Sequence, residues 1–187
     1  MPHHLLPAHA HRRMPWKNGK GETVQIAAWP EGAGLDGFDW RISMAGVTED
    51  GDFSIFPGID RSLAVLTGQG IELRVQGMGL HRLTSDGPAL AFPADRPCLA
   101  RLADGPITDL NLMTRRGRFR HRLVRAGEGL GFVPDWLLLL ATRPARLHVA
   151  GAVLDLGPLD AVICDGPEAA LDPGVVPGAW LAGIAAA

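Results

Sequence analysis

The sequence has little cysteine, little lysine, no tyrosine and no long hydrophobic run. Its two cysteines, Cys98 and Cys164, are too few for a disulfide framework and lack metal-ligand spacing. Both lie in apolar segments, so we predict two buried side chains. The longest apolar runs, 136–141 and 179–187, are shorter than the roughly 20 residues that cross a bilayer. These absences exclude a disulfide-stapled scaffold and argue against a membrane span.

Positive and negative side chains are nearly equal in number. The chain of 187 residues has 18 basic and 20 acidic side chains and a net charge of -2, which excludes a strongly basic nucleic-acid-binding surface. The N-terminal stretch MPHHLLPAHAHRRM has no apolar core of signal-peptide length. We therefore expect a cytoplasmic protein with no nucleic-acid partner and no membrane partner.

Glycine and proline, at 24 and 15 residues, divide the chain into short apolar segments. Few segments keep a helical period, and many short strands at regular spacing are typical of sandwiches and barrels. We predict an all-β protein with one short helix at Pro167–Leu171. The expected strands are Thr23–Trp29, Phe38–Val47, Ser62–Thr67, Ile71–Gln76, Ala89–Phe92, Cys98–Leu102, Thr108–Thr114, Trp136–Thr142, Ala145–Val149 and Ala161–Cys164.

An internal repeat indicates how these strands are organised. Residues 63–80 align without gaps on residues 137–154, and after a four-residue deletion residues 87–97 align on 157–167. Leucine, glycine and proline recur at matching places, which favours two copies of one β unit over chance. We predict two closely packed β-barrels or jelly rolls, one in residues 1–120 and a degenerate second one in residues 121–187.

The first copy also matches the spacing of the cupin metal motif, G-x5-H-x-H-x3-E-x6-G. The match runs from Gly58 to Gly77, but Ala64, Leu66 and Gly70 occupy the three liganding positions. Cys98 stands where the histidine of the second cupin motif would lie. Apolar side chains cannot coordinate a cation that requires nitrogen or oxygen donors, so we predict no metal at this place.

Five phrases identify a family resemblance: MPWKNGKGET, FDWRISMAGV, DGDFSIFPGIDRSL, GPALAFPADRP and DLNLMTRRGR, in this order. Together they closely resemble the HutD/Ves family over residues 12–118. The resemblance implies a bicupin without metal or other cofactor, and a ligand-binding accessory role in histidine utilisation with an intermediate such as formylglutamate. This sequence departs from the family pattern at two positions. Lys20 interrupts the family's glycine-rich turn, and Gln25 stands where many members have an acidic residue.

Two expected strands carry polar side chains on one face. In Phe38–Val47, alternation puts Asp39, Arg41 and Ser43 opposite the apolar residues, and in Thr108–Arg115 it puts Asp109 and Asn111 on one face. The residues alone favour a solvent-facing polar side. The resemblance instead implies that Arg41 and Asn111 face a barrel lumen, where a guanidinium can bind a carboxylate with two parallel hydrogen bonds. Arg61 either joins this set or pairs with Asp60 or Asp39.

The turn RRMPWKNGKG places three different chemistries side by side. Pro15 and the flanking glycines fix a tight backbone that can hold Trp16, Lys17 and Asn18 at a barrel mouth. An indole wall, a cation and an amide suit a small anionic molecule. The alternative is a structural turn in which Trp16 closes one end of the barrel and Lys17 is solvated.

The histidines His3, His4, His9 and His11 form a loose cluster that we interpret as part of a frayed N-terminal segment. An arginine-rich run spans residues 115–125, which we interpret as a solvated strand end that could also dock an acidic partner.

The leading hypothesis is a non-enzymatic protein that binds a small anionic metabolite without a cofactor and regulates histidine utilisation or amino-acid catabolism. Its ligand-binding residues are predicted to be Trp16, Lys17, Asn18, Arg41, Ser43, Arg61 and Asn111. One alternative is an isomerase, lyase or hydrolase with Asp39, Asp109 or Lys17 as the proton-transfer group. Another is a protein-interaction module that uses the second barrel or the arginine-rich run, and a homodimer is left open.

Overall fold

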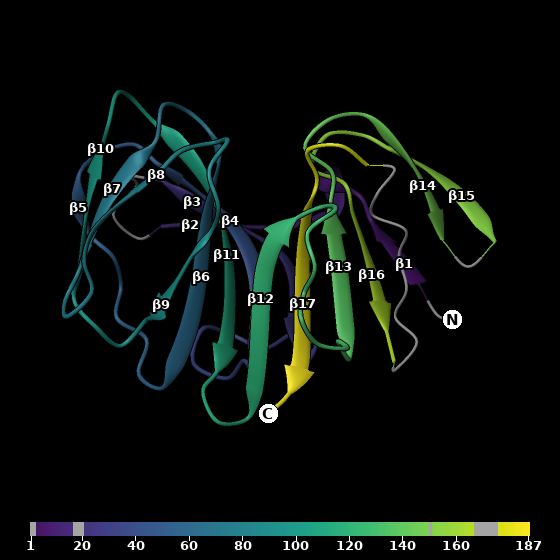
Figure 1. Ribbon diagram of the computed structural model, residues 1–187, viewed down its shortest axis with the longest axis horizontal. Helices are drawn as coiled ribbons and strands as arrows, with labels where there is room; N and C mark the ends of the chain where they lie inside the picture. The colour runs from purple at the N-terminus through teal and green to yellow at the C-terminus, as the bar shows by residue number, and fades with distance from the viewer. Residues whose placement is uncertain (1–2, 17–20, 150, 167–175) are drawn as a thin grey trace. The chain divides into compact units, whose positions relative to one another are not determined.

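Short apolar segments separated by glycine and proline fold into antiparallel strands in the computed structural model, which describes residues 3–16, 21–149, 151–166 and 176–187 (Figure 1). The one helical element within those ranges is a single 3-10 turn at Ala8–Ala10. The all-β prediction is therefore confirmed. The chain divides into two compact units, Arg12–Arg118 and a second unit that combines residues up to His11 with Phe119–Ala187.

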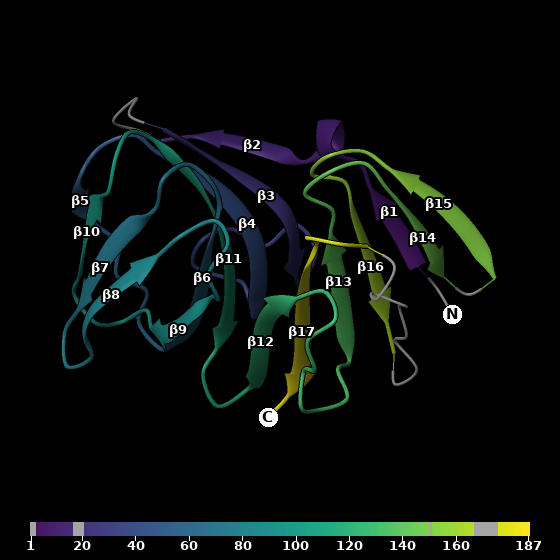
Figure 2. The same cartoon turned by 45° about the horizontal axis from the view of Figure 1, so that its top comes forward.

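The Arg12–Arg118 unit contains two antiparallel sheets. The first has the order β2 (Arg12–Pro15), β3 (Glu22–Trp29), β4 (Trp40–Val47), β11 (Ile107–Arg115), β6 (Ile59–Thr67) and β9 (Leu90–Pro93). The second has the order β5 (Gly51–Asp52), β10 (Cys98–Leu102), β7 (Ile71–Val75) and β8 (Gly79–Leu83). Figure 2 shows β2, β3 and β4 side by side in the larger sheet.

Side chains from both sheets of this unit form one apolar cluster. Leu63 and Val65 of β6 pack with Ile71 and Leu73 of β7 and with Cys98 of β10, all buried. The face of β6 that carries Leu63 and Val65 is therefore the inner face of the unit. Because side chains alternate along a strand, this face also receives Arg61, two residues before Leu63.

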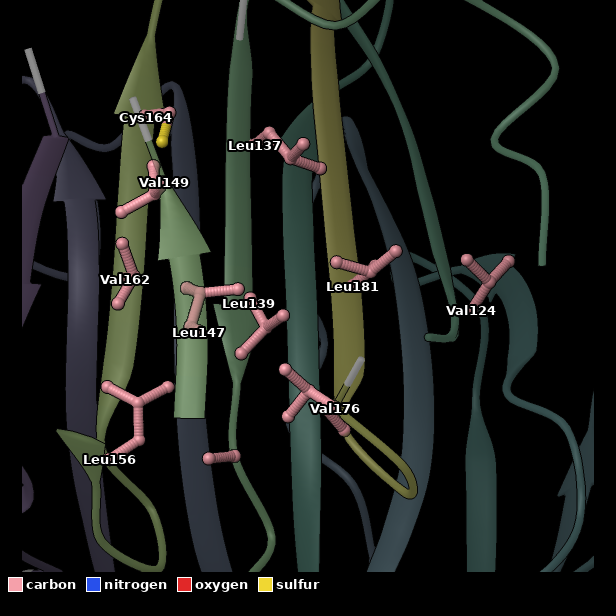
Figure 3. Packing of buried hydrophobic residues seen from close by; sticks show 12 residues of the cluster. Val124, Leu137, Leu139, Leu147, Val149, Leu156, Val162, Cys164, Val176 and Leu181 are labelled. Carbon is pink, nitrogen blue, oxygen red and sulfur yellow. The ribbon is translucent and has the colours of Figure 1, made fainter. Parts of the chain in front are cut away.

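The second unit has a five-stranded sheet and a separate hairpin. The sheet order is β1 (His3–Leu6), β16 (Ala161–Asp165), β13 (Trp136–Leu140), β17 (Trp180–Ala186) and β12 (Phe119–Arg125); the hairpin is β14 (Ala145–Val149) with β15 (Ala152–Leu156). Its core cluster is apolar and includes Leu139, Leu147, Val162 and Leu181 (Figure 3). Cys164 lies in this cluster, so both cysteines are buried as predicted.

The two units share a strand order. The neighbours β9-β6-β11-β4 in the larger sheet of the first unit correspond to β16-β13-β17-β12 in the second, and hairpin β7-β8 corresponds to hairpin β14-β15. The 74-residue shift of the sequence repeat carries Ile71, where β7 begins, onto Ala145, where β14 begins.

The expected strands are all present, with bounds that differ by a few residues, and seven further strands occur: β1, β2, β5, β8, β12, β15 and β17. The interpretation of residues 3–11 as frayed is wrong. His3–Leu6 pairs with β16 along its whole length, and His11 is buried with Nε2 3.1 Å from the carbonyl oxygen of Leu6. We predicted segments 1–120 and 121–187, whereas the residues up to His11 belong to the same unit as Phe119–Ala187. The helix expected at Pro167–Leu171 lies outside the described residues.

The cupin spacing in β6 is out of register with the interior of the unit. Ala64 and Leu66, at two liganding positions of that pattern, alternate with Leu63 and Val65 and so lie on the opposite face from the core cluster. Gly70, at the third position, has φ +116°, and a Cβ there would be 2.5 Å from the carbonyl oxygen of Leu83. Gly70 is therefore required by the turn between β6 and β7. Within the described ranges, no group of three or more His, Cys, Asp or Glu side chains is placed to hold a metal ion.

The arginines of the arginine-rich run are largely exposed, as predicted, and their side chains also make contacts within the protein. Contacts are present for each of Arg115, Arg116, Arg118, Arg120, Arg122 and Arg125. Arg116 bridges Asp60 at 2.8 Å and Asp95 at 2.7 Å, and the Arg125 guanidinium lies 3.9 Å from the centroid of the Trp180 ring. In the part of the chain that the structure describes, no helix has the length and hydrophobicity needed to cross a membrane.

Candidate functional site

A pocket of about 440 Å³ lies within the Arg12–Arg118 unit. Its walls combine two arginines, a buried carboxylate and an amide with aromatic and aliphatic side chains. The lining residues are Trp16, Thr23, Leu35, Arg41, Ser43, Ala45, Val47, Asp52, Phe53, Ser54, Phe56, Arg61, Asp109, Asn111 and Met113. Five of the seven predicted ligand-binding residues are therefore brought together, whereas Lys17 and Asn18 lie outside the described residues.

The register of β4, β11 and β6 arranges the polar side chains in rows. Met113 of β11 lies between Arg41 of β4 and Arg61 of β6, so the two arginines flank it from both sides. The next inward-facing row has Asn111 opposite Ser43, and the row after it has Asp109 opposite Ala45. Rows on one face of a strand are about 7 Å apart. The pocket is thus cationic at one end and carries an acid two rows further along.

The polar faces of β4 and β11 do not meet solvent, so that expectation from the residues alone is wrong. Arg41 is 4% exposed, and Ser43 and Asn111 are each 2% exposed. The physical reason is that both strands lie in the middle of the sheet, with their polar face turned toward the interior of the unit.

The Arg41 guanidinium has a hydrogen-bond partner at one nitrogen and, in the part of the chain that the structure describes, none at another. Its Nε donates to Oε1 of Gln25 at 2.9 Å, whereas Nη2 is buried with no hydrogen-bond partner among the described residues. Burial lowers the pKa of Arg41 to about 10, and the positive charges of Arg61 and Arg12 add to the effect. A charge that burial and like charges disfavour is one that an incoming anion would stabilise.

Arg61 is held in the same manner by a second amide. Its Nε donates to Oδ1 of Asn111 at 2.7 Å, and its guanidinium lies 4.8 Å from the centroid of the Phe53 ring. Burial lowers the pKa of Arg61, and the nearby Asp109 carboxylate partly opposes that shift. The suggested partners Asp60 and Asp39 are instead bound by Arg116 and Arg118.

Asp109 is the most deeply buried charged group of the pocket, at 1% exposure. Its Oδ1 accepts hydrogen bonds from the backbone N–H of Ala45 at 3.2 Å and from Nδ2 of Asn111 at 2.5 Å. Burial raises the pKa of Asp109 to about 6, opposed by Arg61 and by these hydrogen bonds. Asp109 was assigned only to the catalytic alternative, although its alternation with Asn111 already placed it on the same face. The positioning role of Gln25 had no signal in the residues.

Trp16 forms one wall of the pocket. Its indole Nε1 donates to Oγ1 of Thr23 at 2.9 Å, and its backbone N–H donates to the carbonyl oxygen of Gly21 at 2.9 Å. A Cβ on Gly21 would stand 2.8 Å from the carbonyl oxygen of Gly46 and 3.1 Å from the Trp16 ring. The close approach of Gly21 to Gly46 and to the indole therefore leaves no room for a side chain at position 21.

We expect Gly21→Ala to destabilise the protein by about 1–3 kcal/mol, because a backbone atom cannot yield as a flexible side chain can. Urea unfolding followed by circular dichroism measures the change. Gly37→Ala is the matched control, since a Cβ there meets nothing within 4 Å. Equal stabilities for the two variants would show that the Gly21 contact is not tight.

Asp39 does not line the pocket and is an unsuitable proton-transfer group there. It is 8% exposed and accepts a hydrogen bond from Arg118, with Arg115 Nε 3.6 Å away. The site is therefore a pocket of mixed apolar and polar lining in an all-β unit, with two guanidiniums that side-chain amides hold in place.

Comparison with known proteins places this all-β chain in a family. A family model described as HutD matches residues 8–179, so the chain belongs to the HutD family. It is 43% identical over 119 residues to an "Uncharacterized 21.2 kDa protein in hutC 3'region" of Pseudomonas putida, covering 64% of this chain and 62% of that protein. It is 38% identical over 116 residues to "Protein Ves" of Citrobacter koseri, covering 60% and 59%. The matches thus span about three fifths of the length of these curated relatives.

Two solved structures are similar along the whole chain. A conserved protein of unknown function from Pseudomonas aeruginosa PAO1 has a TM-score of 0.82 and 35% identity, covering 100% of this chain and 99% of that one. HutD from Pseudomonas fluorescens SBW25, solved in a formate condition, has a TM-score of 0.80 and 31% identity, covering 100% of both chains. The resemblance to the HutD/Ves family is therefore confirmed.

Proposed function

We propose that this protein binds a small carboxylate-bearing metabolite in the pocket of the Arg12–Arg118 unit and through that binding has a regulatory role in amino-acid catabolism. Arg41 and Arg61 would bind the carboxylate, with Ser43 as a further hydrogen-bonding group and Trp16 as an apolar wall.

The observation that carries this proposal is the pairing of each guanidinium with a neutral amide. Gln25 accepts from Nε of Arg41, and Asn111 accepts from Nε of Arg61. An amide oxygen fixes the direction of a guanidinium and leaves its positive charge in place. A carboxylate in the same position would neutralise that charge. Two oriented positive charges share the pocket with one buried acid, while Asp52, the other acid of its lining, is exposed and screened by solvent. The electrostatic balance inside the pocket therefore favours an anionic ligand.

The regulatory part of the proposal draws on relatives. One is named for its position beside hutC and another is HutD itself, which supports a place with histidine utilisation. A formylglutamate-like intermediate has the carboxylate chemistry that the pocket requires. We further infer a bicupin origin, two jelly-roll units from one duplicated ancestor, on the basis of the sequence repeat and the corresponding strand orders.

A titration of the purified protein with small carboxylates tests the proposal. We expect formate, acetate and N-formylglutamate to raise the melting temperature, because a ligand at 100 times its Kd stabilises the folded state by about 2.7 kcal/mol. Formamide and acetamide, which match the first two in shape but carry no charge, are the controls. No response to any carboxylate, or an equal response to the amides, would contradict an anion site.

A second candidate function is acid–base catalysis, because Asp109 has a pKa of about 6 within the pocket. The same carboxylates can be followed by proton NMR during prolonged incubation with the protein. Conversion of a bound acid, lost in Asp109→Asn, would favour an enzyme over a binding protein.

A further inference from the structure

The Asp109 carboxylate is the feature of the pocket that carboxylate binding alone does not explain. It lines the same cavity as the two arginines and is almost fully buried. A second negative charge brought beside a carboxylate that is only 1% exposed is unfavourable, because water screens a buried charge poorly. A pocket that bound plain carboxylates would bind them better with a neutral side chain at this position.

The hydrogen bonds around Asp109 leave it able to accept one more. Both hydrogen bonds that described residues donate to it, from Ala45 and Asn111, end on Oδ1. An ionised carboxylate has about four acceptor positions on its two oxygens. The acceptor capacity of Oδ2 is therefore available to a group that enters the cavity.

A single amide separates this acid from the nearer arginine. Asn111 accepts from Arg61 Nε at 2.7 Å through its oxygen and donates to Asp109 at 2.5 Å through its nitrogen. With the covalent geometry of an amide, Arg61 Nε and Asp109 Oδ1 are at most about 7.5 Å apart. A ligand that spans them has room for only a few bonds between the group that meets the cation and the group that meets the acid.

We infer that the ligand carries a hydrogen-bond donor, a hydroxyl or an N–H, on the carbon next to its carboxylate, and that Asp109 accepts this hydrogen bond while Arg41 and Arg61 bind the carboxylate. The inference rests on the proposed carboxylate binding and narrows it to a ligand class, the 2-hydroxy acids and N-acyl amino acids. Asp109 is then the residue that determines specificity. A donor at Oδ2 stabilises the ionised acid, whereas a plain carboxylate leaves two negative charges facing each other.

The charged and titratable groups around Asp109 are consistent with a ligand that has its carboxylate toward the arginines and its donor toward Asp109. Arg41 of β4 and Arg61 of β6 lie on the cationic side, Asp52 lines the pocket from an exposed position, and the buried Cys98 thiol of β10 lies near Arg61. Burial raises the pKa of Cys98, which keeps that thiol neutral. Among the described residues of this unit, Asp109 is the buried acid that a ligand in the cavity meets.

Matched acids that differ by one hydroxyl test the inference. Glycolate is compared with acetate, and lactate with propionate, by isothermal titration calorimetry at pH 7.5. We expect the hydroxy acid of each pair to bind at least about 10-fold more tightly, since a hydrogen bond to a charged acceptor contributes about 1.5–3 kcal/mol. Asp109→Asn should reduce the preference to a few-fold or less, and Asp52→Asn, which changes an exposed acid of the same pocket, should keep it.

The outcomes separate this inference from the proposed function. If none of the four acids binds the wild-type protein, both are overturned. Equal affinities within each pair overturn only the donor requirement, as does a preference that Asp109→Asn leaves unchanged. If Asp109→Asn does not fold by circular dichroism, the wild-type preference is measured from pH 7.5 to pH 5.5, a range in which all four ligands remain mostly ionised. It should decline as Asp109 becomes protonated, and a constant preference would overturn the inference.

Discussion

Replacing Arg41 with methionine is expected to weaken the binding of formate and acetate by at least about 30-fold. Removing one partner of a desolvated charged interaction costs roughly 2–5 kcal/mol, and the lower limit corresponds to that factor. Methionine keeps most of the length and apolar packing of the arginine stem. The Kd measured by calorimetry therefore reports the lost guanidinium rather than a collapsed wall.

The same variant should be more stable than the wild-type protein when no ligand is present. Burial and the neighbouring positive charges lower the pKa of Arg41 to about 10, so folding disfavours its charged form. Relief of that cost, set against the lost hydrogen bond to Gln25, should raise the free energy of unfolding by roughly 1–3 kcal/mol. A site selected for binding rather than stability has this signature.

Arg12→Met is the matched control, because Arg12 is an exposed arginine on β2 whose charge also acts on Arg41. It should change formate affinity by less than about 3-fold, since exposed charges are screened by solvent and salt. Equal losses of formate affinity in the two variants would mean that the pocket attracts anions only through the summed electrostatic field of its charges and not through contact with Arg41.

The second large effect is a pH dependence of stability that belongs to Asp109. Its pKa is raised from 3.8 to about 6 by burial, so its contribution to stability is fully present below pH 3.8 and is lost as the pH rises through 6. The wild-type free energy of unfolding should fall by about 3 kcal/mol between pH 3.5 and pH 7 from this group alone. Asp109→Asn lacks this titration.

The measurement is the difference in the free energy of unfolding between Asp109→Asn and the wild-type protein, taken from urea titrations across that pH range. The variant should gain stability relative to the wild-type protein as the pH rises, whatever the difference between the two free energies of unfolding at pH 3.5. All other groups titrate in both proteins, so their contributions cancel in this difference. A flat difference for Asp109→Asn would show that Asp109 is not buried as an acid.

The part of the site that sequence could predict is the part set by strand alternation. Period-two patterns in residues 38–47 and 108–115 place Arg41 and Ser43 on one face, and Asn111 on one face of the other strand. Sequence could not show which side of each strand is turned inward, because that depends on the sheet that packs against it. The resemblance to a family decided that question correctly for Arg41 and Asn111.

The features that escaped prediction depend on partners far away in the sequence. His3–Leu6 has a weak local pattern and forms a strand because Ala161–Cys164 pairs with it. Gln25 lies just before a register shift in the pairing of β3 with β4, and alternation cannot foresee such an irregularity. The cupin spacing around Gly58–Gly77 is limited for a related reason, since spacing alone does not say which face a residue occupies.

The two amides that hold the arginines have a consequence for how the charge preference of this pocket can be changed. Gln25 and Asn111 each differ from an acid by a single amide-for-carboxylate replacement, and neither change would alter the shape of the cavity. Glutamate at position 25 would cancel one positive charge while leaving Arg41 in place. Exchange of an amide behind an arginine for the corresponding acid would therefore shift the preference of this pocket from anionic toward neutral molecules, with both arginines still present.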